Sequence, residues 1–135
     1  MTPHETPKRN VLGEWLHRAD RDIELAAHLL QESAPYTAAI AFHCQQAAEK
    51  YLKALLISWE IPFPKTHDIK ALLNLIARKN ATLAGSLQDA VVLTPYGVAA
   101  RYPGDLPDPD ENEAQEALAL AEKVRGAVMR ALPSF

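Results

Sequence analysis

The stretch PYTAAIAFHCQQAAEKYLKALLISWE, residues Pro35 to Glu60, decides the fold of this chain because its apolar residues recur at helical spacing. Pro35 suits a first helical turn, where its missing N–H costs nothing, and Pro62 and Pro64 prevent the helix from continuing. We therefore predict one long helix whose apolar face contacts the core. The residues of that face are Ile40, Ala41, Cys44, Ala47, Ala48, Tyr51, Leu52, Leu55 and Trp59.

The opposite side of this predicted helix is polar. Hydrogen-bonding and ionisable side chains lie next to one another there over about four turns. We expect this polar face to be a surface, and any chemistry of the protein to start on it. Its residues are His43, Gln45, Gln46, Glu49, Lys50 and Lys53.

Another amphipathic helix is predicted N-terminal to this long helix, from about Val11 to Glu32. Residues 1–10 contain two prolines and few apolar residues, so we interpret them as a flexible N-terminal arm. Residues 11–135 then form a single domain. The apolar positions of the predicted helix alternate in steps of three and four: Leu16, Ala19, Ile23, Ala26 and Leu30.

Two shorter helices are predicted after the long one, at about Asp68–Lys79 and Thr82–Leu93. The connection IPFPKTHD is stiffened by its prolines, and Thr66 or Asp68 can cap the helix that follows it. His67 is thereby held in a fixed place. The expected core positions of the two helices are Ile69, Leu72, Leu73, Ile76, Leu83, Leu87, Ala90 and Val91.

A long loop, TPYGVAARYPGDLPDP, is predicted from Thr94 to Pro109, because its four prolines and two glycines exclude a regular element. Asp110 and Glu113 have the spacing of a capping box, and the last helix runs from there to about Leu132. No alternating strand pattern occurs. The fold class is therefore all-α, an up-and-down bundle of about five helices. The last helix should bury Ala114, Ala117, Ala121, Val124 and Val128.

Composition describes an ordinary globular protein. The chain has 135 residues, 48% of them hydrophobic and 23% charged, with a net charge of −3. The chain has no excess of Lys and Arg from which to form the basic surface that nonspecific binding to nucleic acid requires. The single cysteine excludes an internal disulfide, and no apolar run resembles a secretory signal or a membrane span. We expect a cytoplasmic protein without membrane contact.

The common catalytic and cofactor signatures are absent from the sequence. It has no glycine-rich phosphate loop, no paired cysteines and no HExxH motif. We therefore expect neither a metal site nor a cofactor. Cys44 lies on the apolar side of the long helix, where a buried thiol is inert.

An ordered set of fragments resembles one family. AD-RDIELAAHLL, FHCQQAAEKYLKALL, THDI and RYP occur in this order, and together they resemble the HEPN family, named for nucleotide binding in higher eukaryotes and prokaryotes. The resemblance extends from about Trp15 to Leu132. It implies a helical bundle that is frequently a homodimer and is often encoded beside a small nucleotidyltransferase in toxin–antitoxin modules. The chain also resembles the C-terminal helical domain of kanamycin-type nucleotidyltransferases.

Many HEPN proteins are metal-independent ribonucleases with an Arg, four to six residues and then a His. This sequence departs from that motif, because no histidine follows Arg101. The spacing is met only by Arg21 and His28 in the first predicted helix, which is not the helix of the family's catalytic pair. Ordinary exposed charge is the simpler interpretation of these two residues.

The candidate nucleotide site combines the polar face with two distant segments. Lys50, Lys53 and Arg101 have the charges that hold phosphates, although ion pairs within the bundle explain them equally well. His67 is a candidate base or base-edge contact, or simply part of a helix start. Tyr102 and Tyr96 are candidates for stacking on a nucleobase or for anchoring the loop. The complete candidate set is Gln46, Glu49, Lys50, Lys53, His67, Arg101 and Tyr102.

The sequence supports three functional hypotheses. The first is a nucleotide- or RNA-binding regulatory protein, homodimeric, that acts with a nucleotidyltransferase. The second is a metal-independent endoribonuclease toxin, which the missing histidine after Arg101 disfavours. The third is a protein-interaction module without a small ligand.

Overall fold

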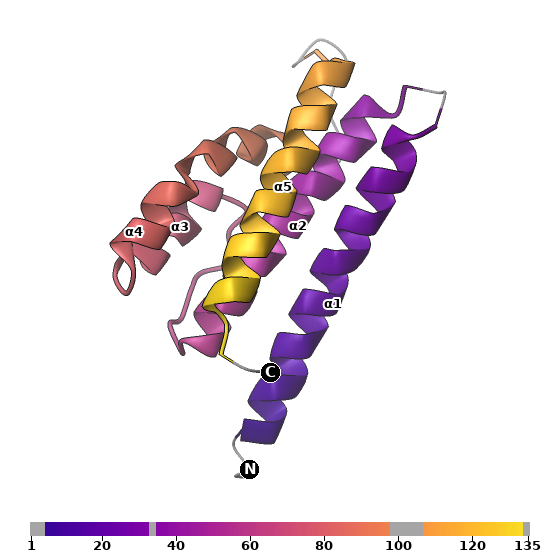
Figure 1. Cartoon of the computed structure of the whole chain (residues 1–135). Helices are drawn as coiled ribbons and strands as arrows, with labels where there is room; N and C mark the ends of the chain where they lie inside the picture. The colour runs from indigo at the N-terminus through magenta and orange to yellow at the C-terminus, as the bar shows by residue number, and fades with distance from the viewer. Residues whose placement is uncertain (1–4, 33–34, 98–106, 134–135) are drawn as a thin grey trace.

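The computed structural model describes residues 5–32, 35–97 and 107–133, and all regular elements in these ranges are helical. Three long helices run beside one another: α1 (Glu5–Leu30), α2 (Thr37–Ser58) and α5 (Glu111–Ala131) (Figure 1). The short helices α3 (Ile69–Ala77) and α4 (Ala81–Ser86) and the 3₁₀ helix η1 (Gln88–Gly97) pack on one side of them. The predicted all-α fold class is confirmed.

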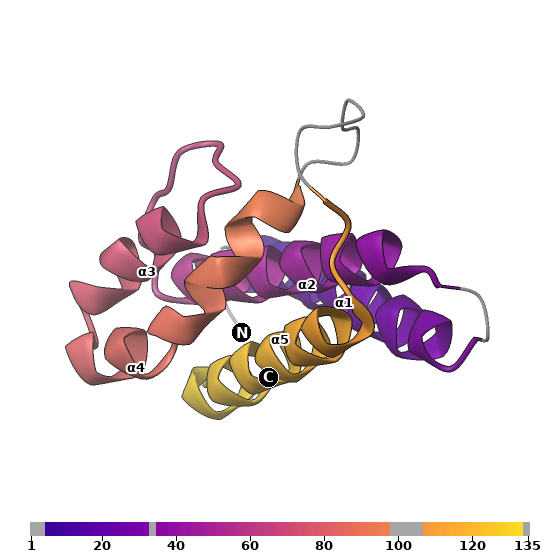
Figure 2. The same cartoon turned by 90° about the horizontal axis from the view of Figure 1, so that it is seen from above.

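Helix α2 is the centre of the bundle. It contacts α1, α3, α5 and η1, so it is covered from several directions (Figure 2). All the predicted apolar-face residues of this helix from Ile40 to Leu55 are buried, and Trp59 packs partly buried against the same core. The predicted inward residues of α3 and α5 are buried as well.

Helix α1 begins earlier than the sequence suggested. The residues predicted to be a flexible arm are helical from Glu5 onward, and residues 1–4 lie outside the described residues. Leu12 is buried against the core, and Lys8 forms an ion pair with Glu60 at 3.3 Å. The ion pair of Lys8, a residue of the predicted arm, ties this part of the chain to the end of α2 and favours the extension of the helix past the apolar repeat.

The segment predicted as a fourth α-helix divides into two elements. Helix α4 ends at Ser86, and η1 continues as a 3₁₀ helix to Gly97, with Pro95 inside it. The predicted loop from Thr94 was therefore wrong over its first four residues. A 3₁₀ helix has about three residues per turn, so side chains three apart point in the same direction. Ala90 and Leu93 within η1 have this spacing and are buried, and it continues back to the buried Leu87, the residue directly before η1.

Capping interactions fix the end of α2 and the starts of α3 and α5. Glu60 has a φ of 59°, and the N–H groups of Glu60 and Ile61 donate to the carbonyls of Ile57 and Leu56. This is the Schellman arrangement that ends a helix. The side chain of Asp68 caps α3 by accepting a hydrogen bond from the N–H of Lys70. The predicted capping box of Asp110 and Glu113 at α5 is present.

In the described part of the chain, no helix combines the length and apolar character needed to cross a bilayer.

Candidate functional site

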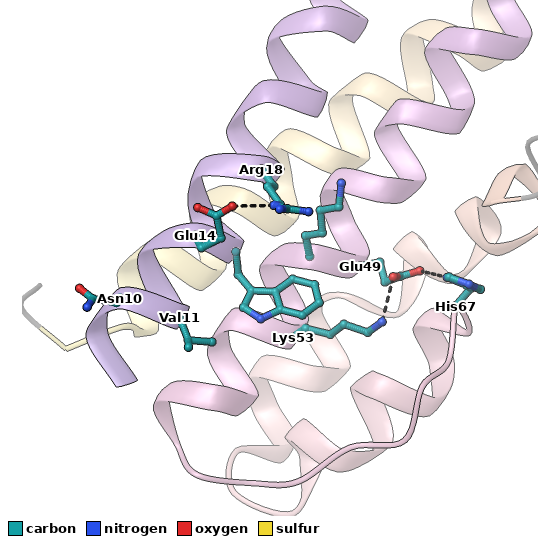
Figure 3. Close-up of a pocket in the computed structure, with 9 residues that line it drawn as sticks. Asn10, Val11, Glu14, Arg18, Glu49, Lys53 and His67 are labelled. Atoms are coloured by element: carbon teal, nitrogen blue, oxygen red, sulfur yellow. Dashed lines mark hydrogen bonds and ion pairs between the residues drawn. The ribbon is translucent and has the colours of Figure 1, made fainter. Parts of the chain in front are cut away.

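A pocket of about 560 Å³ lies where α1, α2 and the connection to α3 meet (Figure 3). Its volume is within the usual range for small-molecule sites. Helix α1 contributes one wall, α2 the second, and His67 the edge. The lining residues are Asn10, Val11, Glu14, Trp15, Arg18, Glu49, Lys50, Lys53 and His67.

The structure brings together four of the predicted site residues: Glu49, Lys50, Lys53 and His67. Gln46 does not line the pocket but donates a hydrogen bond of 2.6 Å to Oε1 of Gln45. The predictions for Arg101 and Tyr102 lie outside the described residues.

The expectation of an open polar face on α2 was wrong for three of its residues. Gln45, Glu49 and Lys53 are buried, with 0%, 3% and 6% of their surface exposed. The reason is the central position of α2, whose polar side is also covered by neighbouring elements. A helical wheel shows which residues share a face but not what covers that face.

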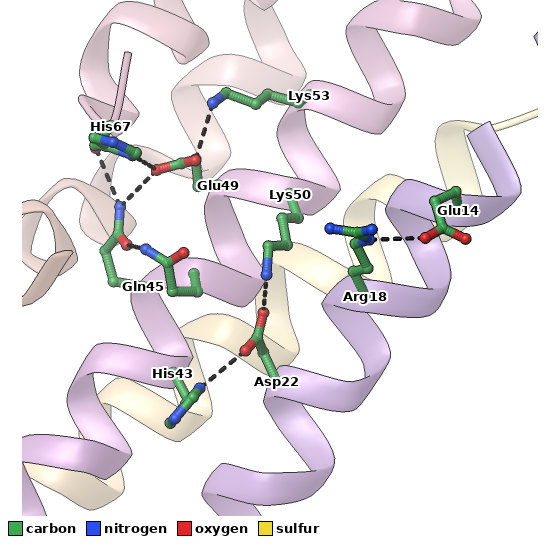
Figure 4. A network of polar contacts seen from close by, with 10 residues as sticks. Glu14, Arg18, Asp22, His43, Gln45, Glu49, Lys50, Lys53 and His67 are labelled. Carbon is green, nitrogen blue, oxygen red and sulfur yellow. Dashed lines mark hydrogen bonds and ion pairs between the residues drawn. The ribbon is translucent and has the colours of Figure 1, made fainter. Parts of the chain in front are cut away.

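Glu49 is the centre of the buried part of the site (Figure 4). Its Oε2 accepts a hydrogen bond of 2.9 Å from Lys53, and its Oε1 accepts bonds from Nδ1 of His67 at 2.8 Å and Nε2 of Gln45 at 3.2 Å. Burial by itself raises the pKa of Glu49, but the hydrogen bonds from Lys53, His67 and Gln45 outweigh it and hold the pKa below its usual value. Glu49 is therefore an ionised carboxylate at neutral pH.

The ionised state of Glu49 determines the protonation of His67. A carboxylate can only accept a hydrogen bond, so Nδ1 of His67 must carry the proton that it donates to Oε1. The backbone of His67 is also held, because its carbonyl accepts a bond of 3.1 Å from Gln45. The imidazole itself is 74% exposed, whereas the carboxylate side chain is only 4% exposed. The ring is thus fixed from the protein side and open on the solvent side.

Lys53 and Trp15 form the floor next to this carboxylate. Nζ of Lys53 lies 5.6 Å from the centroid of the Trp15 ring and 5.8 Å from that of Phe63. Trp15 and Phe63 meet edge to face with centroids 6.5 Å apart. A lysine over aromatic faces gains a cation–π attraction in addition to its ion pair. Lys53 is therefore a structural cation, with its charge balanced inside the protein.

Lys50 and Arg18 are the more accessible cations of the pocket. Nζ of Lys50 lies 2.5 Å from Asp22, which also accepts a hydrogen bond of 2.9 Å from His43. Arg18 pairs with Glu14 at 2.8 Å, and both of these side chains are largely exposed. Exposed pairs of this kind contribute little free energy, so Arg18 can exchange Glu14 for another anion at low cost.

Sequence reasoning missed the contribution of α1. Trp15 and Arg18 were not among the predicted site residues, yet both line the pocket. The available signal was their spacing of three residues, which places the indole and the guanidinium on one face of the helix. Nothing in the sequence indicated that this face lies opposite Lys50.

The alternative pair of Arg21 and His28 has a different environment. Both line a separate hollow of about 390 Å³ formed by α1 residues, and neither lines the pocket between α1 and α2. His28 contacts Glu32, the residue one turn later, at 3.3 Å, and its side chain is 72% exposed.

Over the residues that the structure describes, no group of three or more His, Cys, Asp or Glu side chains is placed to hold a metal ion.

Comparison with known proteins agrees with this architecture. The crystal structure of TT1696 from Thermus thermophilus superposes with a TM-score of 0.72 at 30% identity, covering 90% of this chain and 98% of that one. The crystal structure of ST0689, an archaeal HEPN homologue, gives a TM-score of 0.68 at 24% identity, covering 88% and 95%. No curated protein matches the sequence. The sequence profile of the HEPN domain matches residues 12–131, and the chain belongs to the HEPN domain family.

Proposed function

We propose that the protein binds a nucleotide or a short RNA segment in the pocket between α1 and α2, and that it acts as a regulatory partner of a small nucleotidyltransferase. The observation that carries the binding proposal is that one pocket contains the indole of Trp15 together with Arg18, Lys50 and His67. An aromatic surface suits a nucleobase, and Arg and Lys side chains suit phosphate oxygens.

Charge balance defines the kind of ligand that this pocket suits. Glu14, Asp22 and Glu49 neutralise Arg18, Lys50 and Lys53 within the protein. A polyanion would find no excess of positive charge here, in agreement with the net charge of −3. A small ligand that uses the aromatic surface and one or two phosphate contacts fits better. We therefore favour a mononucleotide or the end of a single strand over a long duplex.

Trp15 offers a direct test of binding. The chain contains two tryptophans, and Trp59 lies outside the pocket, where it contacts Lys79. In a Trp59→Phe background, Trp15 becomes the sole fluorescent indole. We expect ATP, GTP or a short single-stranded RNA to quench this fluorescence in a saturable manner. A ligand at a hundred times its dissociation constant should also stabilise the protein by about 2.7 kcal/mol.

The contribution of the cations is tested with matched lysine variants. Lys50→Met removes a pocket cation that is paired with Asp22, whereas Lys123→Met removes a lysine paired with Asp89 away from the pocket. We expect the first variant to weaken binding by about tenfold, the loss of one charged hydrogen bond, and the second to leave it unchanged. Equal effects of both variants, or no quenching by any of the ligands, would contradict the nucleotide site and favour a pure interaction module.

The partner part of the proposal follows from the family. HEPN proteins are often encoded beside small nucleotidyltransferases and are frequently homodimers, so we propose both associations for this chain. Light scattering on the purified protein, alone and mixed with a small nucleotidyltransferase, tests them. A monomeric mass that does not change on mixing would contradict both proposed associations. It would not affect the test of nucleotide binding by Trp15 fluorescence.

A further inference from the structure

We propose that Nε2 of His67 is a phosphoryl acceptor, with Glu49 as the residue that positions it. The inference shares with the proposed function the idea that Lys50 and Arg18 hold phosphate oxygens, but it concerns a covalent step rather than binding. Its ligand class is a small phosphoryl donor with a good leaving group.

The first argument is the orientation of the ring. Nδ1 of His67 donates to the buried Oε1 of Glu49 at 2.8 Å, so the neutral ring has its lone pair on Nε2. Within the described part of the chain, Nε2 has no hydrogen-bond partner, and the side chain is 74% exposed. A histidine whose one nitrogen is held by a carboxylate and whose other nitrogen is open is arranged as a nucleophile or base.

The second argument is that the carboxylate cannot turn away. Lys53 holds Oε2 of Glu49 at 2.9 Å, while Gln45 bonds both to Oε1 and to the carbonyl of His67. Gln45 and Glu49 are buried, with 0% and 3% of their surface exposed. The ring, its carboxylate and the backbone of His67 are therefore fixed relative to one another before any ligand arrives, which lowers the entropic cost of a reaction at Nε2.

His28 and Glu32 form an exposed histidine–glutamate pair in the same chain, with which the pair of His67 and Glu49 can be compared. His28 is 72% exposed and contacts Glu32 at 3.3 Å, so it matches His67 in exposure and in having a glutamate neighbour. However, Glu32 has 48% of its side chain exposed, whereas Glu49 has only 4% exposed. Of these two pairs, that of His67 is the one embedded in a buried hydrogen-bond network. His28 is therefore an internal reference for the reactivity of His67.

The third argument is the surroundings of His67. It lines the same pocket as Lys50 and Arg18, whose side chains suit the oxygens of a transferred phosphoryl group. Lys53 neutralises the charge of Glu49, so the carboxylate does not repel an incoming phosphate as a free anion would. The pocket thus combines a nucleophilic nitrogen with cations that stabilise the negative charge on the phosphoryl oxygens.

The step is a simple displacement. The Nε2 lone pair attacks the phosphorus atom of the donor, the N–P bond forms, and the bond from phosphorus to the leaving group breaks. With phosphoramidate as donor the leaving group is ammonia, and with a nucleoside triphosphate it is the diphosphate. The proton on Nδ1 stays on the ring, where Glu49 stabilises the positive charge that the phosphorylated imidazole acquires. No oxidant, reductant or further reactant is required.

Phosphoramidate is the probe for this proposal, because it needs no nucleotide-binding surface. The intact protein is incubated with it at neutral pH, and phosphorylation at each histidine is followed by mass spectrometry under neutral conditions. We expect His67 to react at least about tenfold faster than His28, the lower end of the effect that a carboxylate partner has on a histidine that binds a metal. Equal rates at the two histidines would overturn the proposal without any mutation.

A variant tests the role of Glu49. Glu49→Gln alone leaves Lys53 as a buried unpaired charge, so we use the double variant Glu49→Gln, Lys53→Met, which leaves no uncompensated ion. We expect the rate at His67 to fall to that at His28, with the rate at His28 unchanged. If a folded double variant keeps the fast reaction at His67, Glu49 does not position the ring.

The outcomes separate this inference from the proposed function. Fast phosphorylation of His67 without nucleotide quenching of Trp15 would support the phosphoryl acceptor and contradict the nucleotide site. Nucleotide binding with equal reactivity of His67 and His28 would do the reverse.

Discussion

Gly97, the last residue of η1, lies directly against the side chain of Gln45: a Cβ at Gly97 would be 2.8 Å from Cδ and 2.9 Å from Oε1. Gln45 is buried and bonds to Glu49, to Gln46 and to the carbonyl of His67. The close approach of Gly97 therefore connects the 3₁₀ helix to the site, because Gln45 cannot move aside without breaking these hydrogen bonds.

We expect Gly97→Ala to destabilise the protein by about 1–3 kcal/mol, as overpacking of a dense core does. It should also weaken the hold on His67, which NMR of the imidazole signals would report as a change confined to this histidine and its neighbours. The control is Gly85→Ala on α4, where a Cβ meets no atom within 4 Å. That change should be neutral or slightly stabilising. Equal stability of both variants in urea unfolding would contradict the argument.

The buried pair of Glu49 and Lys53 should show strong coupling. Removing one partner leaves a buried charge uncompensated, so we expect Glu49→Gln and Lys53→Met each to cost about 3–5 kcal/mol. The double variant should cost less than the sum of the two, because neither charge remains. A double-mutant cycle from urea unfolding measures this coupling. Additive losses would mean that the two charges do not stabilise each other, contrary to their 2.9 Å contact.

The lowered pKa of Glu49 predicts how stability depends on pH. Its folded pKa lies below the usual 4.5, so the unfolded chain binds the proton more readily than the folded one. The stabilisation is therefore fully present above the unfolded pKa and is lost as the pH falls through the folded pKa. We expect the free energy of unfolding of the wild type to fall below about pH 4.5 more steeply than that of Glu49→Gln, Lys53→Met. Parallel curves for the two proteins would show that Glu49 is not the responsible group.

Cys44 should act as a reporter of global unfolding. Burial, assisted by the charges of Glu122 and Asp22, raises the pKa of the Cys44 thiol to about 12. A thiol reagent reacts with the thiolate, so native Cys44 should resist labelling at pH 8 and should react rapidly in denaturant. The labelling rate in native buffer should follow the unfolding equilibrium, and it should increase in Gly97→Ala. Rapid labelling of the native wild type would contradict the burial of this residue.

Much of the fold could be predicted because helical periodicity is a local property. The apolar stripes of α2, α3 and α5 lie in the core as the spacing of Ile40, Leu72 and Val124 indicates, and the capping box at Asp110 is present. Two boundaries were predicted less well. Helix α1 starts at Glu5, and Lys8 in its first turns pairs with the distant Glu60, a contact that local periodicity does not reveal. The 3₁₀ helix η1 repeats every three residues, so a search for the α-helical repeat of 3.6 does not detect it.

The lining of the candidate site was predictable only in part. The sequence indicated Glu49, Lys50, Lys53 and His67 because they are ionisable residues near one another on a helix and at the start of the next. It did not indicate Trp15 and Arg18, since their place opposite Lys50 depends on how α1 packs against α2. The predictions for Arg101 and Tyr102 remain predictions, because these residues lie outside the described ranges.

By itself, the sequence determined the main helical segments, most of the side chains that enter the core and the family that the chain resembles, since periodicity, caps and motifs are written in the order of residues. Only the tertiary structure decided that the polar side of α2 is buried. Gln45, Glu49 and Lys53 are exposed on an isolated helix, and they become a fixed internal network because the neighbouring helices and the connection carrying His67 close over them. Burial excludes water from these charges and strengthens their mutual hydrogen bonds, which is the physical reason that His67 is held in one orientation.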